Sequence, residues 1–254
     1  MDVNKNTYTF AFAVIMVIIV AAILSSTFIK LKPLQDKNIE LEKKQNILSS
    51  IGINVLRDSS DIIYPFYIKK EIVLNWQGEE VEGSAFDVDL SVELKKDKKE
   101  QLLPLFISEV NQQQKYIIPL RGKGLWGPIW GFIALEEDLN SVYGAVFDHK
   151  AETPGLGAEI NRPFFQDQFQ GKHIFNENEL VSIIVVKGGA DPSDMYSVDG
   201  ISGGTITSDG VSDMLLERLT MYLPYLEKIK IEEEVKLIML EMDSVNSVTD
   251  SIID

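Results

Sequence analysis

A long uncharged stretch lies near the start of the chain, before polar and apolar residues begin to mix. Residues 6–29 contain no charged side chain, and their centre reads FAFAVIMVIIVAAIL. As an α-helix, these residues span roughly 36 Å, which exceeds the hydrocarbon core of a bilayer at about 30 Å. No second apolar run of this length follows. The pattern therefore predicts one transmembrane anchor, in contact with the lipid bilayer.

A cleaved secretory signal is the competing interpretation of this stretch. Such a signal has a strongly basic start, a shorter apolar run and small residues at its cleavage site. Here only Lys5 precedes the run, and no convincing Ala-x-Ala follows it. The sequence therefore favours an uncleaved anchor over a signal or a buried core helix. Lysines flank both ends of the span, so the positive-inside rule does not decide its orientation.

Charged and apolar residues mix directly after the span. Residues 34–50 (LQDKNIELEKKQNILSS) predict a juxtamembrane helix that packs on its own domain, since a coiled coil would need three or four sustained heptads. Residues 67–74 resemble a short strand, and residues 86–94 alternate apolar with polar side chains, as a half-buried strand does. The lysine-rich run at 95–99 is expected to form an exposed turn.

Further apolar runs predict a sheet and one long helix. Short buried strands are expected at residues 116–120, 129–135, 143–148 and 180–186. The last run is nearly continuous in Val and Ile, which is typical of a central strand. An apolar stripe over residues 211–223 predicts a helix with Ser208 or Asp209 as its N-cap, interrupted by Pro224. The whole predicts an α+β domain on a mostly antiparallel sheet flanked by helices.

These patterns divide the chain into four parts. Residues 1–32 form an amino-terminal stub and the anchor, and residues 33–60 form a juxtamembrane helix and linker. Residues 61–230 form one water-facing domain. Residues 231–254 form an acidic helix or tail, for which solvation is a simpler role than partner binding.

Composition removes several kinds of chemistry. The chain carries 39 Asp plus Glu against 24 Lys plus Arg, for a net charge of −15, which opposes binding to nucleic acid. It has no cysteine, and its only histidines are His149 and His173. Disulfides, thiolate metal clusters, cysteine nucleophiles and multi-histidine metal sites are thereby excluded. Any redox work by this chain must use an organic cofactor.

Three glycine-bearing segments remain as candidates for chemistry. Residues 121–131 (RGKGLWGPIWG) place Trp126 beside glycines, where it could cover a planar ligand or anchor a tight turn in the core. Residues 149–157 (HKAETPGLG) form either a structural Ω-loop or a ligand-facing loop. Residues 199–211 (DGISGGTITSDGV) place hydroxyls before the best helix, which suits a phosphate, although a plain glycine-rich turn also fits. The last segment is neither a P-loop nor a dinucleotide fingerprint.

These segments together resemble a known family. DGISGGT at residues 199–205 resembles the flavinylation motif Asp-x-x-Ser/Thr-Gly-Ala-Thr of the FMN-binding domain family. That family includes the NqrC subunit of the sodium-translocating NADH:quinone reductase and the RnfG subunit of the related ferredoxin complex. HKAETPGLG resembles its second signature, and GKGLWGPIWG at residues 122–131 is more similar to the NqrC branch. With the anchor, the resemblance covers nearly the whole chain, although Gly204 stands where the motif has alanine.

The resemblance implies covalent FMN, joined by a flavin transferase through its phosphate to Thr205. Asp199 would belong to what the transferase recognises, and Gly203 and Gly204 would let that enzyme approach the hydroxyl. Ser202 and Thr207 are candidate hydrogen-bond partners of the phosphate or ribityl chain. The neighbours expected around the isoalloxazine ring are Glu152, Thr153, Gly155, Leu156, Gly157 and Trp126. No catalytic residue and no metal ligand is expected.

The resemblance also implies a role and a location. The chain would relay electrons between redox centres of partner membrane subunits in a sodium-translocating NADH:ubiquinone reductase, with no complete activity alone. It would lie in the inner membrane with its amino terminus in the cytoplasm and its domain on the periplasmic side. An RnfG-like electron-transfer subunit is one alternative. A membrane-anchored binding or scaffold module with purely structural glycine loops is another.

Overall fold

The computed structural model describes residues 6–253, with side chains described as far as Met239 apart from Glu233, Glu234 and Leu237. Residues 1–5, which include Lys5, and the last acidic residues of the tail lie outside this description. The chain divides into two compact units, Met1–Lys44 and Gln45–Asp254.

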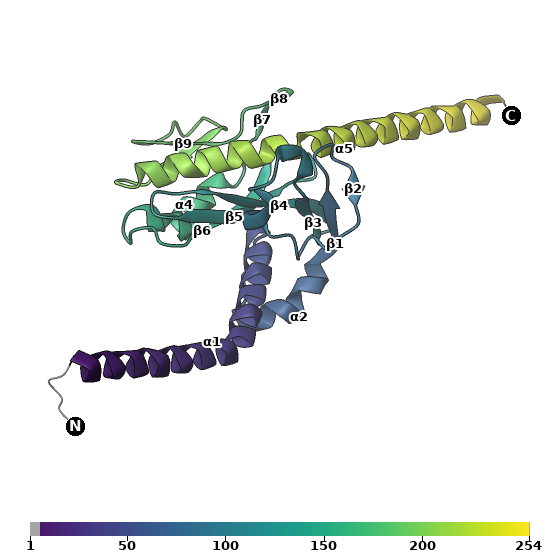
Figure 1. The fold of residues 1–254 in the computed structure, drawn as a ribbon. Helices are drawn as coiled ribbons and strands as arrows, with labels where there is room; N and C mark the ends of the chain where they lie inside the picture. The colour runs from purple at the N-terminus through teal and green to yellow at the C-terminus, as the bar shows by residue number, and fades with distance from the viewer. Residues whose placement is uncertain (1–5, 254) are drawn as a thin grey trace. The chain divides into compact units, whose positions relative to one another are not determined.

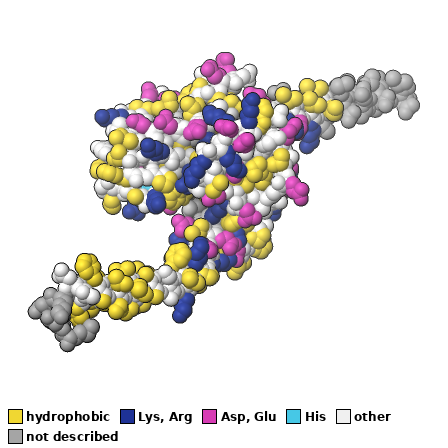
Figure 2. All heavy atoms as spheres, in the orientation of Figure 1, with side chains coloured by type: hydrophobic (Ala, Val, Ile, Leu, Met, Phe, Trp, Pro, Cys, Tyr) yellow, Lys and Arg dark blue, Asp and Glu magenta, His cyan; other side chains and the backbone are white. Residues whose placement is uncertain are grey.

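The first unit contains most of α1 (Asn6–Ser50), a helix that continues through Pro33. The predicted span and the predicted juxtamembrane helix are therefore one element. The most apolar 18-residue window of α1 is fully exposed within the protein, and Figure 2 shows its continuous apolar surface. By length and composition, α1 could cross a membrane.

The second unit is built on a six-stranded antiparallel sheet with the order β2-β1-β3-β4-β5-β6 (Figure 1). Its strands are β1 (Ile68–Leu74), β2 (Glu80–Val81), β3 (Leu103–Val110), β4 (Gln113–Lys123), β5 (Pro128–Leu135) and β6 (Val142–His149). Strands β3, β4, β5 and β6 follow one another in chain order, and each pairs antiparallel with the next through a hairpin. The predicted α+β class and antiparallel sheet are confirmed.

The two faces of the sheet carry separate apolar cores. Because side chains alternate along a strand, Ile118 of β4 packs toward α5 (Thr205–Ile253), while Ile117 packs toward the opposite face. The opposite face is covered by the end of α1, through Ile47 and Leu48, and by α2 (Arg57–Tyr67). The sheet is thus covered on both faces.

Short elements complete the unit. They are α3 (Leu90–Glu93), η1 (Lys98–Glu100), η2 (Gly157–Asn161), α4 (Pro163–Gln166), η3 (Asp167–Phe169), β7 (Phe175–Asn176), β8 (Glu179–Leu180), β9 (Ile184–Val186) and β10 (Ser197–Asp199). β9 and β10 pair in parallel, and Val185 N–H of β9 donates to Ser212 Oγ of α5 at 2.9 Å. A small sheet therefore lies against α5 (Figure 1).

The turn between β5 and β6 is held by one carboxylate. Asp138 accepts hydrogen bonds from the backbone amides of Asn140 and Ser141 at 2.9 and 2.8 Å, and from the Ser141 hydroxyl at 2.6 Å. Burial would raise the pKa of Asp138, but these hydrogen bonds outweigh burial and hold it below its usual value. The ionised form of Asp138 thus stabilises this turn.

Two of the strand predictions were wrong. Residues 86–94 contain α3 instead of a strand, because the Asp89 side chain accepts the Ser91 amide at 2.7 Å and caps a helical turn. The run 180–186 is not a central strand. Its chain bends at Ser182, which has a φ of 61°, and only Ile184–Val186 pairs with β10. Ile183 and Val185 of this segment are buried and join the core beside α5, while Ile184 is exposed.

The predicted limits of the long helix were also wrong. α5 begins at Thr205, six residues before the apolar stripe, and it continues through Pro224. Proline removes one helical hydrogen bond, but Tyr222, Tyr225 and Leu226 are all buried and hold both sides of the proline against the sheet. The run at 95–99 is exposed and lies in a turn and the start of η1, as predicted.

Candidate functional site

The amino terminus of α5 forms the centre of the candidate site. The first hydrogen bond of the helix runs from Ser208 N–H to the Gly204 carbonyl at 2.9 Å, so Gly204, rather than Ser208 or Asp209, stands at the N-cap position. The amides of Thr205, Ile206 and Thr207 have no carbonyl partner inside the helix by its geometry. Together they give this end of α5 a partial positive charge that favours an anion.

The side chain of Glu152 joins all three glycine-bearing segments. Its Oε1 accepts the backbone N–H of Trp126 at 2.8 Å, and its Oε2 accepts the Thr207 hydroxyl at 2.7 Å. Its own backbone N–H donates to His149 Nδ1 at 3.2 Å. Glu152 is only 5% exposed and Thr207 only 1%. We call the hydrogen bonds of the Glu152 carboxylate with Trp126 and Thr207 the Glu152 clasp.

Glycines are required where the segments meet at the clasp. A Cβ atom on Gly124 would lie 2.5 Å from Glu152 Oε1, and one on Gly157 would lie 2.7 Å from Oε2. Gly203 has a left-handed φ of +74°, and a Cβ there would lie 2.6 Å from Leu156 Cδ2. Only glycine allows these backbones to approach so closely. The glycine patterns thus reflect one shared packing site, formed by segments that lie far apart in the sequence.

The hydroxyl groups near Thr205 differ in their surroundings. Thr205 is half-buried at the first position of α5, while Ser202 is exposed on the preceding turn. Thr207 is buried and donates its hydroxyl proton to Glu152. Asp199 is exposed at the end of β10, where its Oδ1 accepts the Ala190 amide at 2.7 Å. Thr205 is therefore the partly accessible hydroxyl at the helix end.

The loop after β6 presents its other predicted residues to solvent. Thr153, Gly155 and Leu156 are exposed, and the Gly155 amide donates to Glu159 Oε1 at 2.9 Å. Gly157 is buried against Glu152 and Thr207. Glu152 and Gly157 therefore have the packing role expected of a structural loop, while the exposed tip between them remains accessible to a ligand.

Large apolar side chains are exposed on the segments that meet at the clasp. The exposed fractions are 66% for Trp126, 47% for Leu125, 57% for Ile206 and 40% for Leu156. An aromatic ring system covered by such side chains would be removed from water. The helix-end amides suit a phosphate, and the exposed apolar side chains suit a flavin ring, so the residues present fit FMN.

Sequence reasoning missed some residues of this site. His149 orients the loop through its Nδ1 atom, and Ser208 Oγ accepts the Ile201 amide at 3.2 Å to close the turn before α5. Neither role has a sequence signal, because each depends on a partner brought close by folding. Among the described residues, no cluster of His, Asp and Glu has the geometry of a metal site.

Several known proteins are similar to this chain. The FMN-binding domain family matches residues 124–220, a range that includes Trp126, Glu152 and Thr205. The NqrC protein of the Na(+)-translocating NADH-quinone reductase of Haemophilus ducreyi is 33% identical over 248 residues, covering 89% of this chain and 96% of that protein. The corresponding protein of Vibrio alginolyticus is 32% identical and covers 76% of this chain. The chain belongs to the NqrC family.

Solved structures of NqrC proteins have the same fold. The crystal structure of the protein from Parabacteroides distasonis superposes with a TM-score of 0.73 at 45% identity, covering 77% of this chain and 96% of that one. The NqrC structure from Shewanella oneidensis, at 24% identity and a TM-score of 0.64, supports the fold alone. The resemblance inferred from the three glycine-bearing segments to the NqrC branch is confirmed.

Proposed function

We propose that this chain is the flavin-bearing NqrC subunit of a sodium-translocating NADH:ubiquinone reductase, with FMN attached through its phosphate to Thr205. The observation that carries the proposal is the position of Thr205 at the positive end of α5, where the three glycine-bearing segments converge. The neighbouring Thr207 hydroxyl is buried and engaged by Glu152. This difference favours Thr205 as the attachment point.

The residues of the site would act by holding the group in place. A phosphoester at Thr205 Oγ makes the cofactor part of the chain, so retention no longer depends on a dissociation constant. The partial positive charge at the end of α5 stabilises the phosphate by at most about 1 to 2 kcal/mol. Trp126 and Leu156 would cover the ring and exclude water from it. When bound, FMN supplies a ring that accepts and donates electrons.

The rest of the role follows from membership of the family. The relatives are named as parts of a Na(+)-translocating NADH-quinone reductase, which favours this complex over the ferredoxin-linked alternative. The chain would pass electrons between redox centres of partner membrane subunits and would have no complete activity alone. A flavin transferase would act on Thr205 during maturation, with Asp199 as part of what it recognises.

Covalent attachment is tested by fluorescence on a denaturing gel. The chain is expressed with a flavin transferase, denatured, separated and illuminated with ultraviolet light. We expect a fluorescent band that Thr205→Ala abolishes. Thr207→Ser should keep the band, because serine keeps the hydrogen bond from this position to Glu152. Absence of fluorescence from the chain without substitutions, expressed with the transferase, would refute the redox role.

Orientation has a separate test, which uses the absence of cysteine from the chain. We propose a periplasmic domain anchored by α1 in the inner membrane. Glu82→Cys introduces one thiol at an exposed position after β2. A membrane-impermeant maleimide should label this variant once the outer membrane is permeabilised and the inner membrane is intact. Labelling only after lysis of the inner membrane would reverse the proposed topology.

A further inference from the structure

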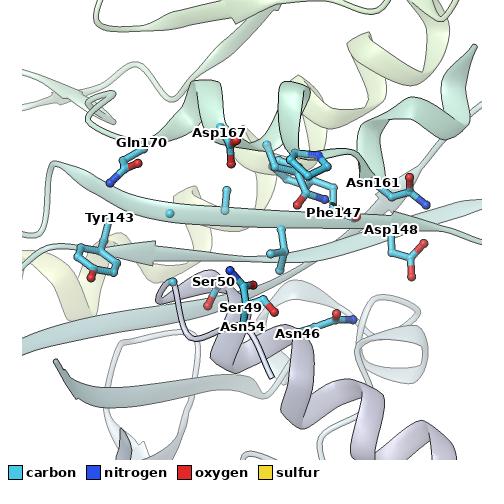
Figure 3. Close-up of a pocket in the computed structure, with 16 residues that line it drawn as sticks. Asn46, Ser49, Ser50, Asn54, Tyr143, Phe147, Asp148, Asn161, Asp167 and Gln170 are labelled. Atoms are coloured by element: carbon cyan, nitrogen blue, oxygen red, sulfur yellow. Dashed lines mark hydrogen bonds between the residues drawn. The ribbon is translucent and has the colours of Figure 1, made fainter. Parts of the chain in front are cut away.

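A polar groove lies beside the outer edge of β6, on the opposite side of this strand from β5. Its volume is about 560 Å³. β6 forms its floor, the end of α1 and the following loop form one wall, and the segment from η2 to η3 forms the other (Figure 3). The wall side chains include Asn46, Ser49, Asn54, Asn161, Asp167 and Gln170. This groove is separate from the clasp residues described above.

The groove exposes the free backbone edge of the sheet. β6 is the last strand of the sheet, and among the described residues no strand pairs with its outer side. Just after β6, Lys150 N–H donates inward to the Pro128 carbonyl at 3.1 Å. Since backbone groups alternate in direction along a strand, those of Ala145 and Phe147 face outward. The Phe147 carbonyl indeed accepts Gln166 Nε2 from the groove wall at 2.9 Å.

Both ends of this outer edge are already closed by the protein itself. At one end, Val142 N–H donates to the Lys172 carbonyl and Gly171 N–H donates to the Val142 carbonyl, both at 2.8 Å. At the other end, the Asp148 carboxylate accepts His149 N–H at 2.7 Å. Between these ends, the Ala145 N–H and carbonyl and the Phe147 N–H face the groove. Native proteins normally cover or block such free strand edges.

The charge of the groove selects the chemistry of an occupant. Asp148 and Asp167 contribute carboxylates, and α1 ends at Ser50 beside the groove with the partial negative charge of a helix carboxyl terminus. Among the described residues that line the groove, none is Lys, Arg or His. Amide side chains supply hydrogen bonds on both walls. A cationic, hydrogen-bonding occupant therefore fits better than an anionic or apolar one.

We infer that this groove binds an extended, Lys- or Arg-bearing segment of a partner subunit, which pairs with β6 as a short additional strand. Addition of a strand to a free edge is an established mode of peptide recognition. Residues 144–148 are about 16 Å long, enough to pair with three or four extended residues. The inference rests on the proposed membership of a multi-subunit complex, and it assigns one docking surface within that complex.

Single cysteines test whether the groove is covered. Asn54→Cys and Gln170→Cys place a thiol on either wall, and Glu82→Cys places one beyond β2 at the opposite edge of the sheet. Maleimide labelling rates are measured for the full chain alone in detergent and within the purified complex. We expect at least tenfold slower labelling of both groove variants in the complex, with Glu82→Cys little changed. Equal rates in both samples would overturn the inference.

Hydrogen exchange tests strand pairing at the backbone. In the chain alone, the amides of Ala145 and Phe147 should exchange fast, while those of Gly144 and Val146, which point toward β5, exchange slowly. In the complex, the first pair should become protected by at least tenfold. Protection of Ala145 and Phe147 already in the chain alone, or none in the complex, would contradict strand addition.

A photo-crosslinker on the Gln170→Cys variant identifies the occupant. The crosslinked residues should map to a Lys- or Arg-bearing segment of another subunit, and Asp167→Lys should reduce the yield at least threefold. Crosslinks to lipid would overturn the inference. Slow maleimide labelling of the groove variants in the isolated chain would also overturn it, because it would show that a small molecule fills the groove. Gel fluorescence of the same samples reports covalent flavin, so loss of the docking result with flavin retained leaves the proposed function standing.

Discussion

The Glu152 clasp provides the sharpest test of how the candidate site is built. Glu152→Ala removes the acceptor of both the Trp126 amide and the Thr207 hydroxyl. Each buried polar group left without a partner costs about 1 to 3 kcal/mol, so the variant should lose about 2 to 6 kcal/mol in free energy of unfolding. That is a large fraction of the stability of a domain, which is typically about 5 to 15 kcal/mol.

Glu152→Gln is the matched control for this substitution. Its amide oxygen can accept the Trp126 N–H, and its NH₂ group can donate to Thr207 Oγ1, because a hydroxyl both donates and accepts. Only the charge assistance of the two hydrogen bonds is lost, so the glutamine variant should lose only about 1 kcal/mol. Thr207→Val, which removes the donor alone, should fall between the two variants.

Urea unfolding of the flavin-free chain in detergent, followed by circular dichroism, measures these differences. With a slope near 3 kcal/mol per molar urea, the alanine variant should lower the midpoint by about 0.7 to 2 M, and the glutamine variant by about 0.3 M. Equal losses for alanine and glutamine would show that charge, and not hydrogen bonding, is what Glu152 supplies. An unchanged midpoint for the alanine variant would refute the clasp altogether.

Four other substitutions test three separate parts of the domain. Gly203→Ala introduces a Cβ at a φ of +74° and 2.6 Å from a neighbouring side chain, so it should destabilise the chain and reduce covalent flavin on the gel. Gly204→Ala is the control: the nearest atom to its Cβ would be 3.1 Å away, so this variant should retain most of the covalent flavin. Tyr222→Phe leaves the Pro104 carbonyl without its 2.6 Å hydrogen bond and should cost about 1 to 3 kcal/mol in urea unfolding, with an unchanged midpoint as the contrary result. The pKa of Asp138 is lower in the folded chain than in the unfolded chain, where it is about 4, so the ionised carboxylate stabilises the fold above pH 4. This stabilisation is lost as the pH falls through the lower pKa of the folded chain. Asp138→Asn should therefore flatten the acidic part of a curve of unfolding free energy against pH, and an unchanged slope would contradict a stabilising role for the carboxylate.

Much of the fold could be predicted from local pattern. Strands β1, β4, β5 and β6 were identified because each has a compact apolar run. β3 had no assigned strand in the sequence, although it lies in the middle of the sheet. Its first four residues are buried on both faces, so the alternation that marks a half-buried strand is absent there. Position within the sheet is a property of the folded chain.

The candidate site shows a similar division. Glycines, hydroxyls and the order of the three segments were sufficient to identify the family, and the motif they form predicts Thr205 as the attachment point. The hydrogen bonds of Glu152 to Trp126 and Thr207 could not be predicted, because they connect positions 26 and 55 residues apart. The difference in burial between Thr205 and Thr207 likewise depends on which side of the first turn faces the loop.

The sequence by itself determined the apolar span, the exclusion of thiol chemistry and of thiolate or multi-histidine metal sites, and the segments that carry the family resemblance. These depend on composition and on short motifs, which persist whatever the tertiary arrangement. Tertiary structure decided that α5 begins at Thr205, that it continues through Pro224, and that residues 180–186 lie beside α5 instead of in the main sheet. The physical reason is packing: burial of Tyr222 and Leu226 maintains the helix past its proline, and the turn at Ser182 directs an apolar run to a different part of the core.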